Sequence, residues 1–139
     1  MIVAGGVGMA QDSPYPIFTV DHLGTTMKAL GPNFRATNAA LADQDYQTAK
    51  ERITRSREQL ATTITFWRQN DKNDAIAILR ETVSKMDDLD AVLSVEMVNE
   101  MAATGLIGEI GMSCRACHDL YREQDPDTNE YRLKLGSVE

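Results

Sequence analysis

The chain has 139 residues, of which 42% are hydrophobic and 25% are charged. These values are ordinary for a globular protein and provide for one domain with a substantial core, but not for two. The 21 acidic and 14 basic residues give a formal net charge of −7. This balance argues against nucleic acid and anionic lipid as partners and suits a protein with a positive docking surface, although the charge also serves solubility alone.

Residues 1–10 carry no charge and resemble the end of the apolar region of a signal peptide, with small residues at Gly8 and Ala10 before a cut ahead of Gln11. The basic segment that opens such a peptide is missing, because the first lysine is Lys28. The run is also too short to span a bilayer. We therefore expect the remnant of a signal peptide, with a retained membrane anchor as the alternative.

Helical periodicity begins after an extended entry segment at residues 11–16 and continues without a convincing strand. The first helix is expected from Ile17 to Ala42, with a bend at Pro32, which removes the hydrogen bond to the Lys28 carbonyl. The core-facing positions of this helix, which step alternately by four and three residues, are Leu23, Met27, Leu30, Phe34, Thr37 and Leu41.

Two further helices follow after short corners. The second is expected over residues 46–69, where apolar residues again recur at helical spacing. The third is expected to end at Leu93 and to begin near Asp71 or Asp74, either of which suits the N-cap position.

The fourth helix is expected over residues 95–123, with Ser94 as its N-cap. Four helices with three short connections predict an all-α, antiparallel four-helix bundle, which occupies residues 11–123. The tail at residues 124–139 is expected to begin with a turn and to continue as coil.

The pentapeptide Cys114-Arg115-Ala116-Cys117-His118 is the attachment signature of a c-type haem. Each thiol adds across one vinyl group of the haem, and the histidine after the second cysteine supplies the proximal ligand to the iron. On a helix, at roughly 100° per residue, Cys117 lies about 60° and His118 about 40° from Cys114, so all three face the same way. The sequence therefore predicts one covalent haem c on the last helix.

Three other interpretations of the pentapeptide are weaker. A thioredoxin-like pair would need a βαβ context, which the helical pattern does not offer. A structural zinc site needs four ligands, whereas the chain contains two Cys and two His in total, with His22 far away in sequence. A chance match is the remaining alternative, although the motif uses both cysteines of the chain.

One face of the last helix is expected to lie against the haem. By helical arithmetic, this face contains Ile107, Ile110, Gly111, Cys114, Cys117, His118 and Tyr121. Gly105, Gly108 and Gly111 are poor helix formers, each costing up to about 1 kcal/mol against alanine, so a close neighbour should compensate. For Gly111 the haem is the better candidate, whereas close packing against another helix explains Gly105 and Gly108 equally well.

A haem motif that closes a four-helix bundle, extended here to the pattern CxxCHxxYR at residues 114–122, closely resembles the cytochrome c′ family, including its low-spin cytochrome c-556 branch. The resemblance covers residues 20–123. The segment MKALG at residues 27–31 resembles the first-helix segment of the c-556 branch. The tail at residues 124–139 exceeds the usual family ending, which leaves a docking role for it open.

The resemblance implies a role for four residues. Met27 is the sixth iron ligand opposite His118, Tyr121 packs on the haem edge, and Arg122 pairs with a propionate. The residues themselves leave alternatives open, because Met27 and Tyr121 also suit a core, and Arg122 also suits an ion pair with Glu123.

These features predict a monohaem electron-transfer protein with low-spin His/Met ligation and no enzymatic activity. Because c-type haem is attached outside the cytoplasm, we expect an exported, periplasmic protein. The alternative is a high-spin, cytochrome c′-like protein that binds nitric oxide or carbon monoxide, and whether Met27 reaches the iron distinguishes the two. Expected partners are redox proteins, with a homodimer or a subunit of a redox complex as further options, and with membrane contact only through an N-terminal anchor.

Overall fold

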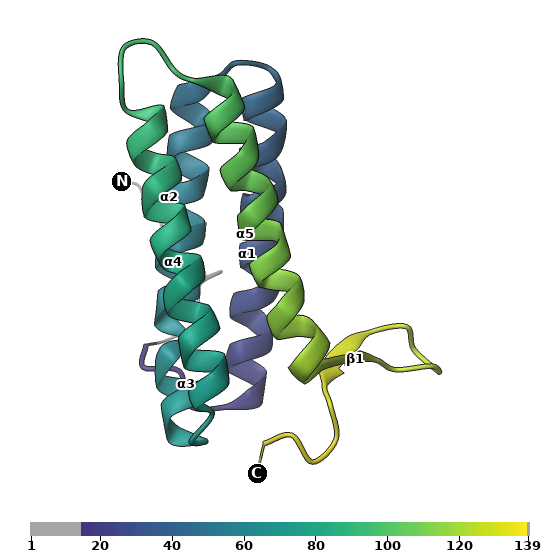
Figure 1. Ribbon diagram of the computed structural model, residues 1–139. Helices are drawn as coiled ribbons and strands as arrows, with labels where there is room; N and C mark the ends of the chain where they lie inside the picture. Colours follow the sequence, from purple (N-terminus) through teal and green to yellow (C-terminus); the bar gives the residue numbers. More distant parts are fainter. Residues whose placement is uncertain (1–14, 139) are drawn as a thin grey trace, which may run out of the picture.

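The computed structural model describes residues 15–138 and is mostly helical (Figure 1), which confirms the prediction of an all-α protein. The expected signal remnant at residues 1–10 lies outside the described residues. Among the described helices, none is long and apolar enough to cross a membrane. In chain order, the elements are α1 (Val20–Ala42), α2 (Tyr46–Thr62), α3 (Ile64–Gln69), α4 (Asn73–Leu93), α5 (Glu100–Tyr121), β1 (Arg122–Gln124) and β2 (Tyr131–Leu133).

The long helices α1, α2, α4 and α5 lie side by side, and successive ones run in opposite directions (Figure 1). α1 packs mainly against α2, α2 also packs against α4, and α4 packs against α5. α1 and α5 contact each other much less. The last helix is therefore held in place chiefly by α4.

Helices α1 and α5 each begin after a residue whose side chain satisfies a backbone N–H group of the first turn. The Thr19 hydroxyl accepts a hydrogen bond from the His22 N–H at 3.1 Å, and the Asn99 carboxamide oxygen accepts one from the Ala102 N–H at 3.0 Å. The prediction that Ser94 caps the last helix is therefore wrong. Ser94 instead follows the last residue of α4, and residues 94–99 form the loop to α5.

The first helix, expected from about Ile17, begins at Val20, because Ile17 is bound to another segment. Its N–H donates to the Thr65 hydroxyl at 2.9 Å, and that hydroxyl donates to the Ile17 carbonyl at 2.8 Å. α1 then continues through Pro32 without interruption. The second expected helix is divided at Thr63, whose hydroxyl donates to the Leu60 carbonyl at 2.7 Å and so competes with the helical hydrogen bonds.

The turn before α4 also differs from expectation. Lys72 occupies the N-cap position without a side-chain hydrogen bond, so neither Asp71 nor Asp74 is the cap. Asp71 adopts a positive φ of 56° in the turn. Asp74 lies in the first turn of α4, where a negative charge suits the helix dipole.

Two apolar clusters follow one another along the helices. The buried residues of the first cluster, toward the α4–α5 loop, are Ala40, Leu41, Ala49, Ile53, Met86, Leu89, Leu93, Ala103, Ile107 and Ile110. Those of the second cluster, toward α3 and the end of α5, are Ile17, Leu23, Phe66, Trp67, Ala75, Leu79 and Tyr121. Leu60 packs against both clusters and joins them into one core.

The tail that was expected as coil forms a β-hairpin instead, and this prediction is wrong. β1 and β2 pair antiparallel, with Arg122 opposite Leu133. Arg132 holds the two strands and the loop together through ion pairs with Glu123 and Asp125, each at 2.8 Å. The strand pairing and the two ion pairs of Arg132 therefore order this segment together.

The hairpin returns to the end of α5. The Lys134 N–H donates to the Tyr121 carbonyl at 2.7 Å, and the Lys134 ammonium donates to the Asp119 carbonyl at 2.6 Å. Carbonyls in the last turn of a helix have no partner within the helix. The segment after β2 therefore satisfies two carbonyls in the last turn of α5.

Candidate functional site

The cysteine-histidine motif lies near the end of α5, where the two apolar clusters meet. Cys114 packs against the first cluster and Cys117 against the second, and both side chains are half-buried. His118 is half-buried as well, whereas Arg115 and Ala116 are exposed. This burial pattern agrees with one common face for the two thiols and the imidazole.

Both thiols are free, and burial raises their pKa. For Cys117, burial is the largest cause, and the nearby negative charges of Cys114 and Asp74 add to it, which raises the pKa to about 11. Reactive and metal-binding cysteines have lowered pKa values, because the thiolate is the nucleophile and the ligand. The surroundings of this pair therefore argue against a thioredoxin-like centre. Within residues 15–138, no group of three or more His, Cys, Asp or Glu side chains is arranged to hold a metal ion.

The surroundings of His118 lower the pKa of its imidazole and so favour the neutral form. Burial lowers its pKa most, the positive charge of Arg122 adds to this shift, and the negative charge of Asp119 opposes it. The neutral imidazole is the form that coordinates a metal. The direction of this shift therefore suits a proximal ligand.

Tyr121 is fixed on two sides at the end of α5. Its ring lies 4.8 Å from the Trp67 ring, at an interplanar angle of 48°. Its hydroxyl donates a hydrogen bond to the Asp74 carboxylate, which lowers the pKa of Asp74. Burial raises the pKa of Tyr121, and this hydrogen bond adds to the shift. The role of Asp74 here could not be predicted from the sequence, because a pairing between α4 and α5 leaves no local pattern.

Arg122 lies outside this buried region. Its guanidinium carbon is 3.8 Å from the centre of the exposed Tyr131 ring, in a cation–π contact. The alternative ion pair with Glu123 is not formed, because Glu123 is bound to Arg132 at 2.8 Å. The structure therefore places Arg122 in the hairpin, from where its charge acts on His118.

The glycines of α5 are not covered by a neighbouring helix. A Cβ atom built on Gly105, Gly108 or Gly111 would meet no atom within 4 Å. Both Gly105 and Gly108 are exposed. The interpretation that another helix packs closely against them is therefore wrong. Gly111 is half-exposed and equally open, so a flat group has room to lie against its backbone.

Met27, the candidate sixth ligand, is half-buried on α1 and packs against the second apolar cluster. Cys117 packs against the same cluster, and Tyr121 is a buried member of it. The structure therefore gathers these three predicted site residues around one part of the core. His22 is only partly buried, in the first turn of α1.

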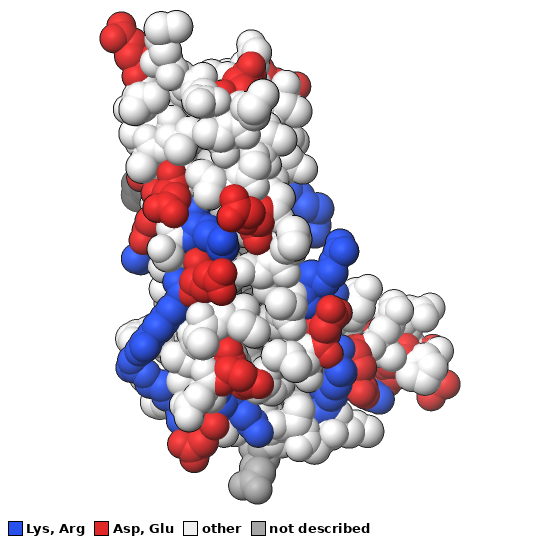
Figure 2. All heavy atoms as spheres, in the orientation of Figure 1, with Lys and Arg blue, Asp and Glu red and all other residues white. Residues whose placement is uncertain are grey.

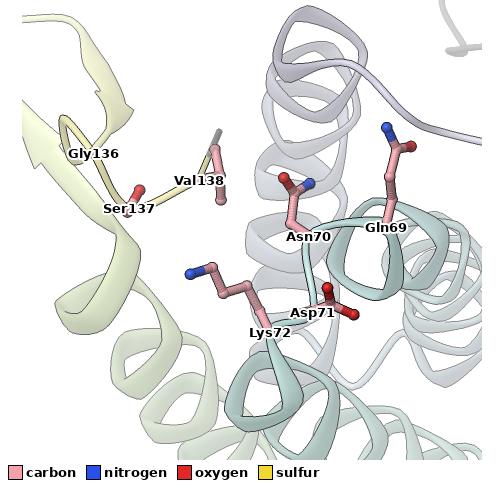
Figure 3. Close-up of a pocket in the computed structure, with 7 residues that line it drawn as sticks. All are labelled: Gln69, Asn70, Asp71, Lys72, Gly136, Ser137 and Val138. Atoms are coloured by element: carbon pink, nitrogen blue, oxygen red, sulfur yellow. The ribbon is translucent and has the colours of Figure 1, made fainter.

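A separate pocket lies between the α3–α4 turn and the segment after β2 (Figure 3). Figure 3 shows the Lys72 ammonium extending toward this segment. The residues that line the pocket are Gln69, Asn70, Asp71, Lys72, Gly136, Ser137 and Val138. None of the predicted site residues lines it, so the pocket is distinct from the candidate site.

The residues at the end of α5 are compatible with a covalently attached haem: two free thiols at the required spacing, a neutral imidazole beside them and an open glycine one turn before Cys114. No family model matches the chain, and neither a curated protein nor a solved structure matches it. The assignment of a function therefore depends on the residues of this site alone.

Proposed function

We propose that the protein is an exported, monohaem c-type cytochrome that transfers electrons. In this proposal, the long helices form an antiparallel four-helix bundle, and Cys114 and Cys117 attach haem c to the last helix, as in the cytochrome c′ and c-556 family. The observation that carries the proposal is the partial burial of both thiols and of His118 at the point where the two apolar clusters meet. When bound, the haem supplies an iron centre that accepts and releases one electron.

The chain's own residues have separate tasks in this proposal. His118 provides its neutral imidazole as the proximal ligand, and the Met27 thioether is the sixth ligand. Asp74 and Trp67 hold Tyr121, so the last turn of α5 is fixed beside the motif. A rigid, largely apolar surrounding suits electron transfer, because ligands that do not move keep the rearrangement between oxidation states small.

Visible spectroscopy of the oxidised and reduced holoprotein tests this proposal. A six-coordinate, low-spin haem with the methionine–iron charge-transfer band in the oxidised form is expected. A protein that acquires no haem in a host with c-type cytochrome maturation contradicts the proposal at its first step.

A second function, binding of nitric oxide or carbon monoxide to a high-spin haem, is favoured by one observation. Met27 packs against an apolar cluster, as an ordinary core methionine does. If Met27 serves only the core, the sixth position is open to a small gas. Carbon monoxide binding by the unmodified, reduced protein distinguishes the two functions, because a methionine ligand blocks this position.

A further inference from the structure

The end of the molecule opposite the hairpin exposes an unusual group of apolar side chains. Met97 is 88% exposed, Met101 is 85% exposed and Val95 is 54% exposed. All three lie within seven residues, in the loop before α5 and the first turn of that helix. Single exposed apolar residues are common, but several that lie close together mark an interaction site in many proteins.

The charges around this group are all negative. The acidic residues at this end are Asp43, Asp45, Asp90, Glu96 and Glu100. The segments at this end, residues 40–49 and 90–104, contain no lysine or arginine. Figure 2 shows the same distribution on the face in view, with red and white but no blue spheres at this end of the molecule.

The two loops that form this end are bound to each other. The Gln44 side-chain amide donates to the Glu100 carboxylate at 3.0 Å, which joins the α1–α2 corner to the start of α5. Each loop is also fixed locally, because Asp45 caps the first turn of α2 and Asn99 caps the first turn of α5. Val95, Met97 and Met101 therefore project from an ordered surface with an acidic rim, which we call the acidic end.

We propose that the acidic end is a docking surface for a protein partner whose contact face carries an apolar pocket rimmed by lysine or arginine. Flexible, polarizable methionine side chains adapt well to such a pocket. A second copy of this chain does not fit, because pairing two acidic ends would place like charges against one another. An anionic membrane is excluded by the same repulsion.

Docking at the acidic end leaves the cysteine-histidine motif free. Met101 and Cys114 are 13 positions apart on α5, which corresponds to about 20 Å along a helix. A partner bound at the acidic end would therefore leave the cysteine-histidine motif uncovered. The surface does not depend on the haem, so its test is independent of the proposed electron transfer.

The test uses the isotope-labelled protein and a synthetic helical peptide with leucine on one face and lysine along both edges. We expect NMR shift changes centred on residues 43–46 and 94–101, and an affinity that falls at least about tenfold between about 50 and about 300 mM salt. The same peptide with glutamate in place of lysine should not bind. Shift changes centred on the hairpin, or spread evenly over the surface, would overturn the proposal.

Matched variants locate the contact. Glu96→Lys, or Met97→Ser combined with Met101→Ser, should weaken peptide binding at least about tenfold. Glu130→Lys in the hairpin loop makes the same charge change elsewhere, and Met112→Ser removes another exposed methionine of α5, so both should leave the affinity within about twofold. If the control variants lost as much peptide affinity as the variants of the acidic end, binding would not be confined to that surface, and the proposal would be overturned. A concentration-dependent dimer that Met97→Ser abolishes would assign the surface to self-association instead.

Discussion

Tyr121, the last residue of α5, donates a hydrogen bond to Asp74, the second residue of α4, and its ring lies against Trp67. This pair ties the end of the helix that carries the cysteine-histidine motif to the start of its main packing partner. The turn that contains His118 is therefore held from outside its own helix.

Tyr121→Phe is expected to lower the free energy of unfolding by about 1 kcal/mol, because it removes the hydrogen bond and keeps the ring. The bond lowers the pKa of Asp74 in the folded protein, so its contribution is present above about pH 4 and is lost as the pH falls. Urea unfolding at about pH 7 and about pH 3 measures both effects. Tyr131→Phe, at an exposed tyrosine, is the control and should change little. A loss of the same size at both pH values would mean that packing, not the carboxylate, is responsible.

Covalent attachment through Cys114 and Cys117 predicts one added haem in the intact mass after c-type maturation. This haem should remain with the chain after extraction with acid and organic solvent, because thioether bonds do not dissociate. Replacing both cysteines with serine should make the haem extractable and lower the stability, since a large bound apolar group stabilises the fold. Haem that extracts freely from the unmodified protein rules out this attachment.

Met27→Leu decides between the two proposed functions. If Met27 is the sixth ligand, the variant loses the methionine–iron band, becomes high-spin and binds carbon monoxide, while the helices remain intact. Met112→Leu makes the same change at a methionine that is 72% exposed and should leave the spectrum unaltered. If the unmodified protein is already high-spin and Met27→Leu changes nothing, Met27 belongs only to the core.

The two histidines are expected to behave differently. His118→Ala should abolish the normal spectrum, because the proposed function assigns the proximal ligand to His118, which follows the second cysteine. His22 lies about 140° around α1 from Met27, at roughly 100° per residue, so His22→Ala should leave the spectrum unaltered. A shift of the haem bands in the His22 variant would instead indicate ligation by two histidines.

Gly108→Ala and Gly111→Ala test which glycine lies against the haem. Both positions are open in the structure, and alanine in a helix is favoured over glycine by about 0.5–1 kcal/mol. In the holoprotein, Gly108→Ala should therefore raise the free energy of unfolding by about this amount. Gly111→Ala should not raise the free energy of unfolding and should shift the haem bands, because its methyl group would press on the haem. Identical behaviour of the two variants would place the haem elsewhere.

Helical periodicity predicted the long helices well, because burial of one stripe follows directly from residue spacing. Leu23, Leu30, Thr37 and Leu41 are buried as their spacing predicts. The helix ends were less predictable, because several residues compete for each cap. At the start of the last helix, Ser94 and Asn99 both suit the N-cap position, and Asn99 holds it.

The hairpin and the Tyr121–Asp74 pair were not predictable for a different reason. Strands of three residues carry too little pattern, and Arg132 and Lys134 order this one through contacts with other segments. The motif at residues 114–118, by contrast, is local and can be read directly from the sequence. Asp74 and Trp67 hold the adjacent Tyr121 through tertiary contacts, which are seen only in the folded chain.

The two hydrogen bonds that Lys134 donates to the end of α5 would be lost in truncated forms of the protein. A chain cut after Glu123 would leave the Asp119 and Tyr121 carbonyls to water and remove the cation at the negative end of the helix dipole. Fraying would begin at the end of α5 and could extend to Asp119, the residue after His118. The hairpin therefore reinforces the segment that carries the motif, and after such a cut the contacts of Tyr121 with Asp74 and Trp67 would be left to hold its last turn.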